Sequence, residues 1–206
     1  MQHQYLENLE EPGTPRSILS VENTYFKIPR RKLVSSSLVF KGLLTLSPDW
    51  NEGKSEERPV VLEKVSSTDF ERLLTYLYPL STDYTRFTEG WDFDYWISIL
   101  KVAHAYMMKD VYAQTIDMLN QLPFPDPFTR IQYGSRYDHS NWIRQGYRDL
   151  IQREEPLSIK EAHALGFEKA ISCAAAREKY RPNRHYHHLD PLFSLTTISK
   201  RHRIDP

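Results

Sequence analysis

The stretch PVVLEKVSSTDFERLLTYLYP, residues 59–79, contains the clearest change from strand to helix in the sequence. Its first part, after Pro59, is a short apolar run of the kind found in a buried strand. Thr68 and Glu71 have the spacing of a capping box, in which a hydroxyl and a carboxylate satisfy free backbone donors at a helix start. The predicted helix ends at Pro79. Its apolar positions, with the spacing i, i+3, i+4 and i+7, are Phe70, Leu73, Leu74 and Leu77.

A β-hairpin and a further helix are predicted before this stretch. Two short β-prone runs, residues 18–21 and 25–28, flank the turn-forming residues 22–24. Pro29 has no N–H group to donate to a sheet, so we expect it to end the second strand. From residue 33 to residue 46, apolar and small side chains recur every three to four positions, which predicts one continuous helix with Leu33 and Phe40 in the core.

The region after residue 90 predicts a pair of helices and then a boundary. One apolar stripe comprises Trp96, Ile99, Leu100, Ala103 and Met107. A second helix is expected after Asp110, through Ile116 and Leu119. The sequence LPFPDPF, residues 122–128, interrupts this pattern with three prolines, so it is the best candidate for an internal boundary.

Helical patterns return after the boundary and then stop. Ser158 and Glu161 form a second capping-box pattern, and Gly166 separates it from the next helix. Two apolar stripes are expected to face the core: Ile143, Tyr147, Leu150 and Ile151, and then Phe167, Ala170, Ile171 and Ala174. From residue 181 the periodicity is lost, which predicts an extended tail in which the apolar stretch PLFSLTTI, residues 191–198, is able to dock.

Composition and charge exclude several classes of protein. With 40% hydrophobic and 26% charged residues, the chain has the composition of a folded globular protein. Its 27 basic and 27 acidic residues make nucleic acid an unfavoured partner. No run approaches the roughly 18 apolar residues of a membrane helix, the start is too acidic for a signal peptide, and no Asn-x-Ser/Thr acceptor occurs. These features predict an intracellular protein, cytoplasmic or nuclear.

The distribution of charge is less even than the total. Residues 1–15 contain Glu7, Glu10 and Glu11 and no Lys or Arg, whereas residues 177–206 contain seven basic residues against three acidic ones. Two short basic clusters, KIPRRK at residues 27–32 and SKRHR at 199–203, are consistent with nuclear import or phosphate contact. We favour the interpretation that both are solvated.

Three motifs resemble the BTB/POZ domain. The sequence VENTYFKIPRRKLVSSSLVFKGLL, residues 21–44, is similar to the family's second strand and first helix, and residues 59–79 resemble its third strand and following helix. WISILKVAHAYMMKDVYAQTIDML, residues 96–119, is similar to its helical hairpin. The positions that match the first two motifs are Phe26, Arg30, Leu33, Ser37, Val39, Phe40, Phe70, Leu73, Leu74, Leu77 and Tyr78.

This resemblance implies an α+β BTB/POZ fold, a small sheet flanked by helices, with a C-terminal all-α extension. The expected segments are a flexible lead-in at 1–16, the BTB/POZ domain at 17–122, a helical extension at 123–181 and an extended basic tail at 182–206. The extension resembles that of fungal BTB proteins of the basidiomycete type. The expected core residues are Phe26, Leu33, Phe40, Phe70, Leu73, Leu74, Leu77, Trp96 and Leu100.

The resemblance also implies a protein–protein interaction module that forms homodimers through its first helix and exposed edge strands. Tyr25, Val34 and Leu38 are apolar residues that the core does not use, so they are the predicted interface. A cullin-type ubiquitin ligase adaptor and a transcriptional co-regulator are alternatives. Two departures from the family pattern, Pro29 and the stretch PRSILSV at 15–21, alter the charged groove and the strand exchange that many members use.

An enzymatic function has little support in the sequence. Phosphate-binding, dinucleotide-binding and hydrolase motifs are absent. Cys173 is a candidate nucleophile if His163 or His139 lies beside it, although its setting favours a structural role. The imidazoles of His185, His187 and His188 are spaced closely enough to bind a metal incidentally. We therefore predict no catalytic residue, cofactor or functional metal site.

Overall fold

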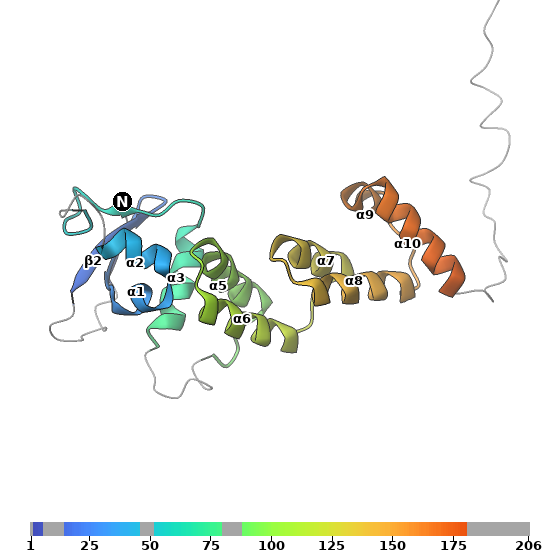
Figure 1. Ribbon diagram of the computed structural model, residues 1–206, viewed down its shortest axis with the longest axis horizontal. Coiled ribbons are helices and arrows are strands. Elements are labelled where there is room, and N and C mark those ends of the chain that lie inside the picture. Colours follow the sequence, from blue (N-terminus) through green and yellow to red (C-terminus); the bar gives the residue numbers. More distant parts are fainter. Residues whose placement is uncertain (1, 6–14, 46–51, 80–87, 181–206) are drawn as a thin grey trace, which may run out of the picture. The chain divides into compact units, whose positions relative to one another are not determined.

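A computed structural model describes residues 2–5, 15–45, 52–79 and 88–180 of the chain (Figure 1). These residues form two compact units, the first ending at Phe124 and the second beginning at Pro125. The division falls inside the proline-rich stretch 122–128. The architecture is α+β as predicted, with a small mixed sheet and helices in the first unit and helices alone in the second. None of the described helices is long and apolar enough to cross a membrane.

The sheet of the first unit has four strands in the order β1-β3-β2-β4. They are β1 (Gln2–Tyr5), β2 (Arg16–Val21), β3 (Thr24–Pro29) and β4 (Val60–Val61). β2 and β3 pair antiparallel as the predicted hairpin, and Pro29 is the last residue of β3. Glu22 and Asn23 form its two-residue turn with φ of 47° and 66°, which is the requirement of a type I′ hairpin.

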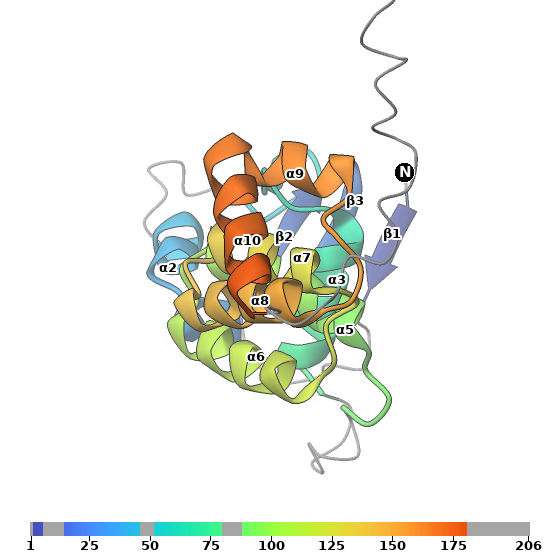
Figure 2. The same cartoon turned by 90° about the vertical axis from the view of Figure 1, so that its right-hand side faces the viewer.

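β1 corrects one prediction. Residues 1–16 were expected to be a flexible lead-in, but Gln2–Tyr5 form a strand that pairs parallel to β3, from Gln2 opposite Thr24 to Tyr5 opposite Lys27 (Figure 2). The physical reason is that the outer side of β3 carries backbone donors and acceptors that need partners. The predicted strand after Pro59 is also shorter than expected, because β4 has two residues and Val61 is exposed.

The predicted single helix over residues 33–46 is wrong. The structure has two helices, α1 (Arg31–Ser36) and α2 (Leu38–Thr45), separated by Ser37 in an extended conformation. The Ser37 hydroxyl accepts a hydrogen bond from the backbone N–H of Phe40 at 3.1 Å and donates one to the carbonyl of Tyr106. A serine that caps the next helix in this way competes with helix continuation.

The helix α3 (Ser67–Leu77) is capped by a different residue from the predicted one. Ser66, and not Thr68, is the N-cap, and its hydroxyl accepts a hydrogen bond from the N–H of Asp69 at 3.1 Å. The predicted capping box with Glu71 is therefore wrong. Both hydroxyls lie before the apolar run, so the sequence pattern places the helix but does not select its cap.

The helices α5 (Phe93–Ala105) and α6 (Lys109–Gln121) form a hairpin that packs on α3 and completes the first unit (Figure 1). Met107 was predicted in the core stripe, but it is 65% exposed because it lies after the end of α5 with a φ of 53°. Aromatic pairs fill the centre: the ring centroids of Phe26 and Phe70 are 5.1 Å apart, and those of Phe40 and Tyr106 are 4.5 Å apart. Nine expected core residues are all buried: Phe26, Leu33, Phe40, Phe70, Leu73, Leu74, Leu77, Trp96 and Leu100.

In the second unit the described residues, which end at Tyr180, form four helices: α7 (Pro127–Arg136), α8 (Ser140–Gln152), α9 (Ile159–Leu165) and α10 (Phe167–Tyr180). The predicted tail, residues 182–206, lies outside them. Ile131, Leu150 and Leu165 form its core cluster. The capping box of Ser158 and Glu161 is confirmed.

The predicted inward stripe of α10 is wrong. Phe167 is 81% exposed and Ile171 is 55% exposed, so neither faces the core. The inward position on this helix belongs instead to Cys173, which is buried. Cys173 lies on the side of α10 that faces Tyr147 of α8. The predicted stripe would instead have turned Phe167 and Ile171 toward the core.

Candidate interaction surface

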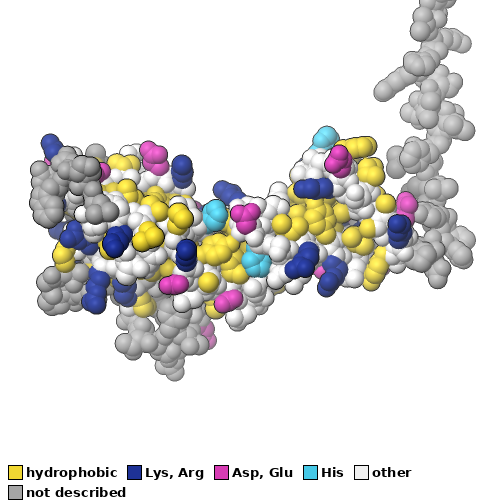
Figure 3. Space-filling model, viewed as in Figure 1, with side chains coloured by type: hydrophobic (Ala, Val, Ile, Leu, Met, Phe, Trp, Pro, Cys, Tyr) yellow, Lys and Arg dark blue, Asp and Glu magenta, His cyan; other side chains and the backbone are white. Residues whose placement is uncertain are grey.

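A groove of about 640 Å³ lies along α1 and α2 in the first unit. We call it the α1–α2 groove. Its apolar lining comes from Pro15, Val34 and Leu38. Its cationic lining comes from Arg30, Arg31 and Lys41, and no carboxylate is found among the described residues that line it. Figure 3 shows Lys and Arg side chains next to hydrophobic ones over these two helices.

Local helix geometry explains why these side chains face outward. Leu33 and Phe40 are completely buried and fix the inner faces of α1 and α2. Val34 follows Leu33 by one position, so its side chain is turned away from the core. It is half-buried. Leu38 is the first residue of α2 and is 81% exposed, so its apolar side chain faces outward at the groove.

The basic cluster of residues 27–32 is divided between two roles. The guanidinium of Arg30 donates a hydrogen bond to the carbonyl of Leu44 at 3.1 Å, so it holds the groove's edge against the end of α2. Lys32 points elsewhere: its ammonium donates to the carbonyl of Leu77 at 2.6 Å and lies 5.2 Å from the ring centroid of Tyr78. The interpretation of a wholly solvated cluster is therefore wrong for Lys32, which joins α1 to the end of α3.

The three residues predicted as the interface are not brought together. Val34 and Leu38 line the groove, but Tyr25 does not. Tyr25 lies on β3, which has β1 on one side and β2 on the other, so it occupies a central strand. Sequence reasoning missed the cationic lining. The sequence feature that could have indicated this lining is the basic cluster between Pro29 and Leu33, which was interpreted as solvated.

Cys173, His139 and His163 are the described thiol and imidazole groups that were considered for catalysis. Cys173 is buried in the second unit, and burial raises the pKa of its thiol, which disfavours the thiolate that a nucleophile needs. The Nδ1 atom of His139 accepts a hydrogen bond from the N–H of Trp142 at 3.3 Å and caps α8. His163 is exposed on α9.

No group of three or more His, Cys, Asp or Glu side chains could hold a metal ion within the described residues. The histidines at positions 185, 187 and 188 lie outside them. What the described surface does offer is an apolar groove with cationic side chains, a combination suited to contact with another protein.

The sequence model of the BTB/POZ domain matches residues 16–122, which is more than half of the chain. The chain belongs to the BTB/POZ domain family. BTB domains mediate protein–protein interactions, and the match runs from β2 to α6, so it includes both helices of the α1–α2 groove. No curated protein matches this sequence. The match does not reach the second unit, whose resemblance to fungal extensions has no support from these comparisons.

Proposed function

We propose that this BTB protein is a non-enzymatic interaction module that self-associates through the α1–α2 groove. The observation that carries the proposal is Leu38, which is 81% exposed beside Val34 in the groove. Burying an aliphatic side chain of this size contributes about 1.5 to 3 kcal/mol. The groove also lies within the part of the chain that matches an interaction domain.

The sheet supports the proposal with a second surface. β4 lies at one edge of the sheet and has only two residues, of which Val61 is 61% exposed. An exposed edge strand can accept a strand from a partner through backbone hydrogen bonds. Tyr25 belongs to a central strand, so we do not retain it in the proposed interface.

The test is the oligomeric state of the full chain with Leu38→Glu, measured by sedimentation equilibrium over a range of concentrations. An unpaired charge buried in an interface costs on the order of 3 to 5 kcal/mol, so the association constant should fall by roughly two to four orders of magnitude. Met107→Glu is the matched control, because Met107 is exposed in the same unit and does not line the groove. Equal association constants for Leu38→Glu and the unsubstituted chain would contradict the proposal.

The alternatives have separate readouts. A cullin-adaptor role requires that the chain retain a cullin in a pull-down, and a transcriptional role requires nuclear retention of the isolated chain. A cryptic enzyme would lose a measurable activity in Cys173→Ala. The buried thiol with its raised pKa supports the non-enzymatic proposal over this last alternative.

A further inference from the structure

Three consecutive serines, Ser35, Ser36 and Ser37, lie where α1 meets α2, and they differ in exposure. Ser37 is buried, and its hydroxyl donates a hydrogen bond to the carbonyl of Tyr106. Ser36 is half-buried, and its hydroxyl donates to the carbonyl of Lys32 at 2.6 Å. Ser35 is exposed, and its hydroxyl makes a longer hydrogen bond, of 3.0 Å, to the same carbonyl. Ser35 is therefore the member of this run that presents its hydroxyl to solvent.

Ser35 also lines the α1–α2 groove, where the charged side chains are cationic. Arg31 precedes it by four positions on α1, a spacing that places two side chains on the same face of a helix with Cβ atoms about 5 to 6 Å apart. Arg30 and Lys41 line the same groove, and no carboxylate does so among the described residues. These surroundings favour a negatively charged group on the Ser35 hydroxyl.

The sequence before Ser35 suits an enzyme that attaches such a group. Arg30, Arg31 and Lys32 stand five, four and three positions before it, and charge patterns of this kind help a kinase to select its substrate. Ser35 is the fifth of the six residues of α1. A helix of this length depends on its tertiary contacts, so its last turn can open locally to reach an active site.

We propose that the Ser35 hydroxyl is a phosphorylation site and that its phosphate regulates self-association through the α1–α2 groove. The enzyme is a serine kinase that selects basic residues, and ATP is the phosphoryl donor. The Ser35 oxygen bonds to the γ-phosphorus, the bond to the β-phosphate breaks, ADP leaves, and the hydroxyl proton passes to a base of the kinase. The regulatory half rests on the proposed self-association, whereas the assignment of the site does not.

The phosphate should strengthen self-association. A phosphoserine carries a charge of about −1.5 to −2 at pH 7 and three acceptor oxygens. In a two-fold dimer the groove meets its own copy, so Arg30, Arg31 and Lys41 face the same cations. A phosphate on each copy neutralises much of this charge and accepts charge-assisted hydrogen bonds from the cations of either copy.

The first experiment identifies the modified serine in the folded chain. The full chain is incubated with a serine kinase that selects basic residues, with Mg²⁺ and ATP, and fragmentation mass spectrometry locates the phosphate within residues 33–41. We expect it on Ser35 and not on Ser36 or Ser37. Ser35→Ala should abolish this modification, and Ser36→Ala should not.

A synthetic peptide of residues 27–41 is the control for recognition by the kinase. If the kinase does not modify Ser35 in the peptide, recognition through the basic cluster is wrong. If it modifies Ser35 in the peptide but not in the full chain, the fold withholds this serine and the assignment of the site is overturned.

The second experiment measures the effect of a phosphate on every chain, with Ser35→phosphoserine introduced during translation. Sedimentation equilibrium at about 0.05 M NaCl, where screening is weak, compares this chain with the unsubstituted one. The association constant should rise roughly tenfold, and the gain should shrink in Arg31→Gln, where the phosphate loses one partner. Ser135→phosphoserine is the matched control and should change nothing, because Ser135 is exposed on α7 in the second unit.

The outcomes separate this inference from the proposed function. If the chain self-associates and the phosphate leaves the association constant unchanged or lowers it, the regulatory half is overturned and self-association stands. If the chain is monomeric with and without the phosphate, self-association itself is contradicted.

A ³¹P NMR titration tests the cationic surroundings without reference to self-association. The second pKa of the phosphate should be lower in Ser35→phosphoserine than in Ser135→phosphoserine, because nearby cations favour the dianion. Equal pKa values would show that Arg31 and Lys41 do not hold the phosphate, which would overturn the proposed role of the groove.

Discussion

The carboxylate of Glu22 accepts a hydrogen bond from the backbone N–H of Ser67 at 3.0 Å and another from its hydroxyl at 3.3 Å. Glu22 lies in the β2–β3 turn with a φ of 47°, and Ser67 is the first residue of α3. A carboxylate at a helix N-terminus satisfies free N–H groups and interacts favourably with the helix dipole. The hairpin turn thus helps to position the helix that carries Phe70 and Leu74 into the core.

Glu22→Ala should therefore lower the free energy of unfolding of the first unit by about 0.5 to 2 kcal/mol, the usual cost of losing a helix cap. Chemical denaturation followed by circular dichroism measures the change. Glu89→Ala removes an exposed carboxylate from the same unit and should change stability by less than about 0.5 kcal/mol. Indistinguishable values for the two variants would show that the contact contributes nothing measurable.

Salt should strengthen self-association if the α1–α2 groove is the interface. In a two-fold dimer the same patch meets itself, so Arg30, Arg31 and Lys41 of one copy face a positively charged surface. Salt screens this repulsion, and the association constant should rise between about 0.05 and 0.5 M NaCl. Lys41→Gln should raise association at low salt and weaken the salt dependence. An association constant that falls with salt would indicate instead that the groove's partner is acidic.

The sequence predicts the elements of the first unit well because their signals are local. The hairpin has its turn residues and the helix α3 has its apolar spacing, so both are placed within a residue or two. The break at Ser37 was not predictable in the same way, because the hydroxyl's second partner is the carbonyl of Tyr106, 69 residues away in sequence. The orientation of α10 depends likewise on which side chain fits against α8.

The candidate groove was predicted only in part for the same reason. Val34 and Leu38 were identified by elimination, as apolar residues that the core does not need. Tyr25 met the same criterion. It lies in a central strand, however, because β1 pairs with the outer side of β3, and no local sequence pattern predicted β1. The role of Lys32 required knowledge that the end of α3 lies within reach of α1.

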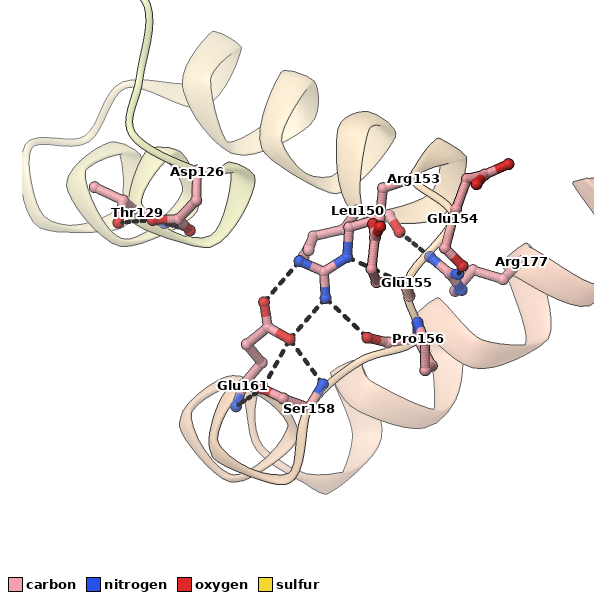
Figure 4. Close-up of polar contacts among 10 residues, drawn as sticks. All are labelled: Asp126, Thr129, Leu150, Arg153, Glu154, Glu155, Pro156, Ser158, Glu161 and Arg177. Atoms are coloured by element: carbon pink, nitrogen blue, oxygen red, sulfur yellow. Dashed lines mark hydrogen bonds and ion pairs between the residues drawn. The ribbon is translucent and has the colours of Figure 1, made fainter. Parts of the chain in front are cut away.

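Stability of the second unit should depend on pH through Glu161. The Arg153 guanidinium donates two hydrogen bonds to this carboxylate, at 2.7 and 2.8 Å, and holds its pKa at about 2, below the ordinary 4.5 (Figure 4). Because folding lowers the pKa, the stabilisation is present above pH 4.5 and is lost as the pH falls toward 2. Both side chains are largely shielded from solvent, so screening by water is limited.

Glu161→Gln should lower the free energy of unfolding at pH 7 by about 1 to 3 kcal/mol, the range for losing hydrogen bonds to a charged group. The difference from the unsubstituted chain should shrink between pH 4.5 and pH 2, where the native carboxylate becomes protonated. Urea unfolding of both proteins at several pH values measures this difference in the free energy of unfolding. Glu178→Gln, an exposed site on α10, is the control. A difference that stays constant down to pH 2 would assign the effect to packing and not to charge.

Two glycines, one on each helix, allow α7 and α8 to pack closely. A Cβ atom on Gly146 of α8 would lie 2.6 Å from the Ile131 Cγ1 atom and 2.7 Å from the Pro127 carbonyl oxygen. The carbonyl belongs to the backbone of α7 and cannot rotate away, so the helices must separate. Gly134 of α7 has the equivalent constraint against Ile143.

Gly146→Ala should therefore destabilise the second unit by about 1 to 3 kcal/mol, the usual cost of overpacking. Gly42→Ala is its matched control, because Gly42 lies inside α2 and a Cβ there meets no atom within 4 Å. This substitution should stabilise the first unit by about 0.5 to 1 kcal/mol through helix propensity alone. Thermal unfolding resolves the two signs. A stabilising Gly146→Ala would mean that α7 and α8 lie farther apart than these contacts require, whereas a neutral Gly42→Ala would contradict only the propensity argument.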